Sequence, residues 1–400
     1  MKKELIKKLE ELSLSDEVFL ISESHPYFGL KSQSENKLIE ECIELISKIK
    51  TYQIFNEHLQ LLGGSSMIVS YGQLLTWLYL QTKKSSAKQA IKILDDYIKS
   101  DSFEAEQIEL VAQTLSDSEW EFCNGVRFAE PYNICDSFLA AQLIHEKYSG
   151  SFAPHPRVTA ILAYKFDHPI FHMPSKVDEQ KEKWPKVNIP FNQIKLTRLL
   201  LSLAKPAEYG IHSIAQTTVA PDDTPIVTYS RSWSTLPSFK PPLGPSILEI
   251  EFRRADEFIK SFDKLSEEFQ HRLLISLDKL NDYGSGNLLE NRAIDLRVCI
   301  ESIFLADGNK EQLRYRVSLR AALLLGKSTE EKHEIFNTIK SAYDITSTVI
   351  HNGKFSKSND LKLLKSAAEY CRKAIVYLIT NGPVDWQSLE FGEKLAITND

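Results

Sequence analysis

The sequence predicts a mainly α protein: a helical N-terminal region, a mixed α/β middle section and a helical bundle in the C-terminal third. Apolar residues recur at three- and four-residue steps in the first and last thirds, as in amphipathic helices. Between them prolines gather and the helical period is interrupted, which favours strands and loops. We therefore expect helical residues 1–150, a strand and loop section with a linker at 151–245, a bundle at 246–382 and a loosely attached tail at 383–400.

The N-terminal region is expected to hold successive amphipathic helices. Residues 34–50 begin with a Ser N-cap, carry acids in their first turns and end in lysines, an order that suits the helix dipole. The other helices are predicted at 2–12, 70–81, 86–98 and 103–115. The short apolar strings at 18–22 and 66–70 are open to interpretation as strands.

The middle section is predicted to alternate strands with loops. Residues 157–166 and 225–231 are rich in β-branched and aromatic side chains, and 247–252 are a weaker strand candidate. Only residues 195–204 keep a helical period. The Pro-Pro pair within 238–245 can continue neither a helix nor a strand ladder, so we expect the main linker there.

Asp167, His168 and His172 raise the alternative of a metal-dependent hydrolase. Histidine and carboxylate side chains are common zinc ligands. Pro169 and Pro174 oppose a regular helix, so the spacing of the two histidines does not put them on one helix face. The five cysteines are scattered singly, which predicts neither a disulfide framework nor a zinc site. We expect no metal and no cofactor.

The C-terminal third is expected to form a helical bundle. Residues 253–281 give one long helix or two in succession, and later helices are predicted at 293–305, 311–326, 333–353 and 358–382. Gly326 is expected to close its helix in the left-handed conformation. The helix at 333–353 is predicted to turn an apolar stripe inward, consisting of Ile335, Ile339, Ala342, Tyr343 and Ile350.

Polar side chains border the apolar stripes of three of these helices. They are Arg297 and Glu301, then Arg316 and Arg320, then Asp344, Ser347, Thr348, His351 and Asn352. A long cationic side chain can bury its stem while its head reaches a carboxylate or a phosphate. Two interpretations stay open, because the same charges can form an internal ion-pair network, and a helix-terminal histidine can simply be favoured by the helix dipole.

This pattern resembles the HEPN superfamily of helical nucleotide-binding and RNase domains, and within it the Apea-like branch. The resemblance covers the last third of the chain and rests on Glu301 and on the segments 316–326 and 343–353. It implies a HEPN-like bundle that acts as a metal-independent endoribonuclease on RNA, in anti-phage defence or as a toxin. Active members of the family carry an Arg, then four to six residues and then a His, whereas the position five residues before His351 is Thr346 in this sequence.

The resemblance also implies the roles of the candidate residues. The catalytic set is His351 for proton transfer, Arg316 and Arg320 facing the phosphate, and Glu301 as an orienting acid, with Asn352, Ser347 and Arg297 as RNA contacts. Cleavage without a metal needs a proton acceptor, a proton donor and a cation for the developing charge. Thr346 favours the alternative, a catalytically degenerate HEPN module that binds RNA or a protein partner without cleaving.

Charge permits an RNA partner without requiring one. The net charge is −6, yet residues 287–380 carry 15 Lys and Arg against 11 Asp and Glu, so this part is +4 and the remainder −10. No apolar run has the length of a membrane span, and the first residues lack the apolar core of a signal peptide. We expect a cytoplasmic protein that pairs as a homodimer through its bundle, with an N-terminal region that meets a protein partner or phage trigger.

Overall fold

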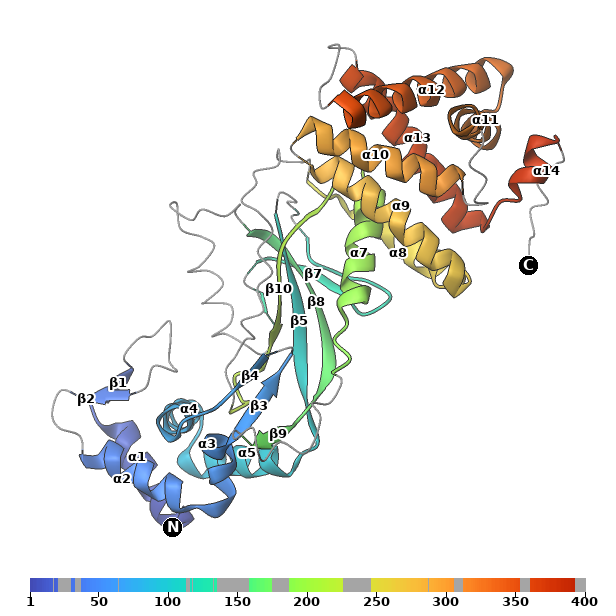
Figure 1. Cartoon of the computed structure of the whole chain (residues 1–400). Coiled ribbons are helices and arrows are strands. Elements are labelled where there is room, and N and C mark those ends of the chain that lie inside the picture. The colour runs from blue at the N-terminus through green and yellow to red at the C-terminus, as the bar shows by residue number, and fades with distance from the viewer. Residues whose placement is uncertain are drawn as a thin grey trace. The chain divides into compact units, whose positions relative to one another are not determined.

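We describe the protein from a computed structural model (Figure 1). The described residues are 1–16, 18–20, 30–32, 37–63, 65–112, 116, 118–131, 133–134, 158–174, 187–225, 246–286, 288–305, 312–352 and 360–392. The chain is mainly α with an α/β part, as predicted. Its residues fall into two compact units. The first unit is Met1–Leu110, Ala129–Phe191 and Ile214–Leu236, and the second is Val111–Phe128, Asn192–Ser213 and Pro237–Asp400.

The helices of the first unit share one apolar core, to which Leu9, Tyr52 and Trp77 contribute fully buried side chains. The helices are α1 (Lys2–Leu14), α2 (Lys37–Lys48), the short 3-10 helix η2 (Lys50–Tyr52), α3 (Gln53–Glu57), α4 (Tyr71–Lys84) and α5 (Ala87–Lys99). The Ser70 hydroxyl accepts a hydrogen bond from the Gln73 backbone and caps α4. The helices predicted over 2–12, 34–50, 70–81 and 86–98 are thus confirmed, with the start of the second outside the described residues.

Antiparallel pairings organise the short strands near the helices of the first unit. β1 (Val18–Leu20) pairs with β2 (Leu30–Ser32), and β3 (His58–Leu62) pairs with both β4 (Ser65–Met67) and β9 (His172–Pro174). The strand interpretation of the apolar strings at 18–22 and 66–70 is therefore confirmed in part. Gln60 lies opposite Met67 on one side and His172 on the other.

A five-stranded sheet has the strand order β10-β5-β8-β7-β6. Its strands are β5 (Ser102–Ala112), β6 (Trp120–Glu121), β7 (Arg127–Ala129), β8 (Val158–Pro169) and β10 (His212–Val219). β8 confirms the strand predicted at 157–166, whereas residues 226–231 and the predicted linker at 238–245 lie outside the described residues.

The prediction of a helix at 103–115 is wrong for residues 103–112, because they form β5, and 113–115 lie outside the described residues. The segment is rich in Glu, Gln and Leu, which favour helices, but Glu106, Gln107 and Glu109 are buried in the strand. The Thr218 hydroxyl on β10 donates to Gln107 Oε1 at 2.7 Å, and such cross-strand pairing overrides the local propensity.

The second unit is mostly helical, and α9 to α13 form a bundle (Figure 1). The helices are α7 (Phe191–Leu203), α8 (Glu249–Phe262), α9 (Glu267–Ser285), α10 (Leu289–Phe304), α11 (Leu313–Leu325), α12 (Thr329–Asn352), α13 (Asp360–Asn381) and α14 (Trp386–Glu390). Two successive helices thus cover 253–281, and the strand candidate at 247–252 is wrong because α8 begins there. In the described residues no helix combines the length and the apolarity that crossing a bilayer requires.

Gly326 ends α11, but in the extended conformation with φ −82°, so the expected left-handed C-cap is wrong. The reason for a glycine is space. A Cβ at this position would lie 2.5 Å from Cγ of Lys332 and 2.8 Å from the Ala322 carbonyl oxygen. Only Gly permits the start of α12 to approach the end of α11 this closely.

The segment predicted as a loosely attached tail instead contains α14, which packs on the bundle. Trp386 is 7% exposed and Leu389 is 8% exposed. The Trp386 ring lies 5.9 Å from the Phe304 ring of α10. Asp385 caps α14 by accepting hydrogen bonds from the backbones of Gln387 and Ser388.

Candidate functional site

Arg297, Glu301 and Tyr343 form a closed polar network between α10 and α12. Glu301 accepts hydrogen bonds from Arg297 Nε at 2.5 Å and from the Tyr343 hydroxyl at 3.0 Å. The Arg297 guanidinium also lies over the Tyr343 ring, 3.2 Å from its centroid. Burial raises the pKa of Tyr343 to about 12, so the phenol keeps the proton that it donates. The network therefore joins two helices.

Arg316 and Arg320 are engaged with α14. The Arg320 side chain is 1% exposed, and its Nε lies 2.6 Å from Glu390 Oε1. A second Arg320 nitrogen donates to the Phe304 carbonyl oxygen at 2.6 Å. Arg316 Nε lies 3.7 Å from the same Glu390 oxygen. These contacts fit the internal ion-pair interpretation better than a phosphate-facing role.

The two arginines leave α11 on the side opposite to the one that faces Asp344 of α12. An α-helix turns by about 100° per residue, so Arg316 lies about 200° and Arg320 about 240° around the axis from Arg314. Arg314 reaches α12, where it donates to both carboxylate oxygens of Asp344 at 3.0 and 3.1 Å. Arg314 is thus the arginine of α11 that shares a side with Asp344, and the sequence prediction missed it. The sequence could have indicated this, because Arg314 and Arg316 lie on opposite sides of the helical wheel.

His351 is exposed at the end of α12. Asp344, Thr348 and His351 are spaced at four and three residues, which aligns them along one face of the helix. Ser347 is partly buried, and the side chain of Asn352 lies outside the described part of the chain. The helix rises about 12 Å from Tyr343 to His351. Glu301 and Arg297 contact Tyr343, so they are separated from the histidine by about this distance along the helix axis.

Thr346 points into the bundle. It is 0% exposed, and its hydroxyl donates to the Tyr343 carbonyl oxygen at 3.0 Å. Val349 is also buried, at 3% exposure, whereas Ile350 is 47% exposed. The prediction that Ile350 faces inward is wrong, because the inward stripe continues through Thr346 and Val349 at steps of four and three residues.

The outer surface of α11 and α12 combines cations with aromatic rings. We call it the α11–α12 face, and its residues are Arg314, Tyr315, Phe336, Lys340, Asp344, Thr348 and His351. Tyr315 is 52% exposed and meets the Phe336 ring edge-on at 5.7 Å. Lys340 Nζ lies 5.8 Å from the centre of the same ring. Exposed rings beside cations can stack on bases and contact phosphates.

The metal-hydrolase alternative is not supported by the first unit. His168 is buried, and its Nε2 accepts a hydrogen bond from the Gly63 backbone at 2.8 Å. Its Nδ1 lies 2.9 Å from the Pro169 carbonyl oxygen, so both ring nitrogens are engaged. Asp167 is the adjacent residue of β8 and points to the opposite, exposed side. Among the described residues, no group of three or more His, Cys, Asp or Glu side chains is placed to hold a metal.

Comparison with known proteins brings no further candidate residue into the site. No family model and no curated protein matches this sequence, and no solved structure matches this fold. The resemblance of the C-terminal third to HEPN domains therefore stays a prediction that rests on the residues quoted for it.

Proposed function

We propose that the helices from α8 to α13 form a HEPN-like module that binds single-stranded RNA on the α11–α12 face and does not cleave it. The observation that carries this proposal is the contrast between the two sides of α11. Arg316 and Arg320 are bound to Glu390 and are at most 13% exposed, whereas Arg314, which pairs with Asp344, and Tyr315 are 53% and 52% exposed. The side of α11 with Arg314 and Tyr315 can stack on bases and contact phosphates, whereas the side with Arg316 and Arg320 holds α14 in place.

The absence of cleavage follows from the residues around His351. Metal-independent cleavage needs a cation at the phosphate in addition to the group that transfers protons. Arg316 and Arg320 are instead paired with the carboxylate of Glu390. The position of the family's arginine holds a threonine whose hydroxyl is bonded inside the bundle.

Endoribonuclease activity is the second candidate, and one observation favours it. His351 is exposed on the same line of α12 as Asp344, to which Arg314 is bound. Arg314 is therefore the guanidinium that would have to stabilise the phosphate. In this version the Arg314–Asp344 pair opens when RNA binds.

Binding is tested with a fluorescein-labelled 12-nucleotide single-stranded RNA, by fluorescence anisotropy on the full chain. Tyr315→Ala is expected to weaken binding at least fivefold, because stacking on one aromatic ring is worth about 1–3 kcal/mol. Arg314→Gln and Lys340→Gln each weaken it several-fold. The matched control is Arg254→Gln, an exposed arginine of α8. Equal affinities for all four variants and the parent would exclude the α11–α12 face as the binding surface.

Cleavage is tested on total RNA with the parent and His351→Ala in the presence of a metal chelator. We expect intact RNA with both proteins. Degradation by the parent that disappears in His351→Ala and in Arg314→Gln would establish the nuclease instead.

Self-association through the bundle and recognition of a protein partner or phage trigger by the N-terminal region also remain predictions. Light scattering on the eluting full chain measures the mass of the particle and so tests the homodimer. A mass of one chain at micromolar concentration excludes pairing as a requirement for RNA binding.

A further inference from the structure

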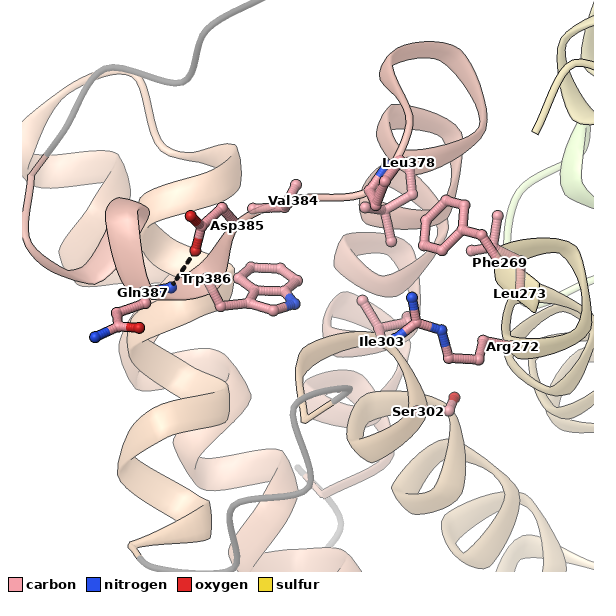
Figure 2. Close-up of a pocket in the computed structure, with 11 residues that line it drawn as sticks. Phe269, Arg272, Leu273, Ser302, Ile303, Leu378, Val384, Asp385, Trp386 and Gln387 are labelled. Carbon is pink, nitrogen blue, oxygen red and sulfur yellow. Dashed lines mark hydrogen bonds between the residues drawn. The ribbon is translucent and has the colours of Figure 1, made fainter. Parts of the chain in front are cut away.

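A pocket of about 310 Å³ opens in the second unit beside the connection from α13 to α14 (Figure 2). Its lining comes from α9, the end of α10, the end of α13 and α14. The residues are Phe269, Arg272, Leu273, Ser302, Ile303, Leu378, Pro383, Val384, Asp385, Trp386 and Gln387. A space of this size holds a small organic molecule.

The walls are mostly apolar and include two aromatic rings. Phe269 and Leu273 come from α9, Ile303 from α10 and Trp386 from α14, and all four are at most 7% exposed. Such walls favour a flat, apolar body over a strongly hydrated ion.

Arg272 supplies a cation that extends from α9 toward Ile303 (Figure 2). Its guanidinium carbon lies 5.3 Å from the centre of the Phe269 ring. Its Nε is buried, and among the described residues it has no hydrogen-bond partner. Arg272 also lines the pocket, so an acceptor that enters it can pair with the guanidinium, and a charge-assisted hydrogen bond of this kind is strong.

The acid of the lining does not neutralise this cation. Asp385 accepts hydrogen bonds from the backbones of Gln387 and Ser388 at 3.0 and 3.2 Å, and from the Ser388 hydroxyl at 2.8 Å. In Figure 2 its carboxylate turns toward Gln387. The carboxylate therefore caps α14 and leaves Arg272 as the charge inside apolar walls.

We propose that this pocket binds a small organic anion, a planar ring that carries one carboxylate or phosphate. The anionic group pairs with Arg272, and the ring packs against Trp386 and Phe269. A guanidinium can donate two parallel hydrogen bonds to either group, so both anions fit the same chemistry. This site shares no residue with the α11–α12 face and does not depend on RNA binding.

The test is isothermal titration calorimetry of the full chain with two probes and their neutral counterparts. The probes are 1-naphthoate for the carboxylate and adenosine 5′-monophosphate for the phosphate, beside 1-naphthylmethanol and adenosine. We expect at least one anion to bind with one site per chain, at least tenfold more tightly than its neutral counterpart. The probe that binds identifies which of the two anionic groups the pocket accepts.

Variants assign the binding to the pocket. Arg272→Met keeps an unbranched apolar side chain without the charge and is expected to weaken binding at least tenfold. Arg272→Lys keeps the positive charge and is expected to retain part of the affinity. The matched control Arg254→Met binds as the parent does, and thermal unfolding of each variant verifies that it folds. Should Arg272→Met not fold, the Lys variant and the comparison of anion with neutral probe decide the question. The proposal is overturned if neither anion binds at millimolar concentration, or if a folded Arg272→Met binds as tightly as the parent.

Discussion

In the proposed function, Thr346 stands at the position that distinguishes a binding module from a cleaving one. It is fully buried and bonded to the Tyr343 carbonyl. Thr346→Arg is expected to destabilise the protein by roughly 3–5 kcal/mol, because a buried charge without a partner carries a penalty of that order. Thr346→Val removes only the hydroxyl and is expected to cost about 1 kcal/mol. Urea unfolding measures both. A Thr346→Arg protein that is as stable as the parent and cleaves RNA would show that this position opens to a catalytic cleft.

Arg320 and Arg316 are distinguished by their distance from Glu390. Breaking a buried ion pair by removing one partner costs roughly 3–5 kcal/mol, and the partly exposed Glu390 lowers this to about 2–3 kcal/mol for Arg320→Gln. The longer Arg316 contact at 3.7 Å predicts a loss below about 1 kcal/mol for Arg316→Gln. Chemical denaturation of the two variants checks the ranking. Equal and small losses would contradict a bracing role for Arg320.

The sequence predicts which residues carry polar groups at the helix borders, but not which way they point. Arg316, Arg320 and Glu301 lie at such borders as expected from the helical period. The direction of the two arginines depends on Glu390, which lies seventy residues after Arg320 in the sequence. No local pattern links them, and residues after 382 were expected to form a tail. Arg314 was missed for the same reason, since its partner Asp344 lies thirty residues later in the sequence, on α12.

At the scale of the element, α14 is short, so tertiary contacts must hold it. Trp386 packs against Phe304 and lies 5.3 Å from the Arg320 guanidinium, ring centre to carbon. Trp386→Ala is expected to lower the free energy of unfolding by roughly 3 kcal/mol, at the lower end for a buried tryptophan because the helix lies at the surface. The matched control is Phe391→Ala, where the side chain is 78% exposed and a loss below about 0.5 kcal/mol is expected. Similar losses for the two variants, measured by thermal unfolding, would contradict this docking.

Two histidines of the first unit are shielded from solvent: His168 on β8 is buried, and His172 on β9 is partly buried opposite Gln60 of β3. Burial lowers the pKa of His168 and lowers that of His172 to about 4. A histidine whose folded pKa lies below its unfolded value near 6.5 stabilises the fold above pH 6.5, and this contribution is lost as the pH falls toward 4. For His172, which is partly exposed, we expect a loss of about 1–2 kcal/mol after allowing for solvent screening.

This dependence is measured as the difference in unfolding free energy between pH 7 and pH 4.5. His172→Asn is expected to shrink that difference by about 1–2 kcal/mol. The control Lys88→Met changes an exposed side chain of α5 and leaves the difference unchanged. An unaltered difference in His172→Asn would mean that other groups set the acid sensitivity.

β5 marks the limit of local sequence patterns at this scale. A helix with a cap and a one-sided apolar stripe, such as α5, was predicted because both signals lie close together in the sequence. β5 obtains its partners from β8 and β10, and Gln216 donates to Glu109 at 3.2 Å across more than a hundred residues. The composition of the segment favours a helix and does not indicate the partner strands, so the helix prediction failed there.

At the scale of the whole molecule, the distribution of charge limits how the chain meets RNA. Residues 287–380 carry a net +4 within a chain of −6, so most of the surface repels phosphate. Attraction then depends on few contacts, and each phosphate contact with single-stranded RNA contributes about −0.7 to the slope of log K against log salt.

With Arg314 and Lys340 as permanent cations, we expect the α11–α12 face to contribute a slope of about −1.4, far below that of a strongly basic nucleic-acid binder. Arg314→Gln and Lys340→Gln should each flatten the slope by about 0.7, and Tyr315→Ala should lower affinity without changing it, since stacking releases no counterions. Fluorescence anisotropy titrations at salt concentrations between about 50 and 200 mM measure the affinity and the salt slope of the three variants. If the slope stays the same in the two glutamine variants, the phosphates lie on another surface of the chain, and the contrast between the two sides of α11 has a purely structural meaning.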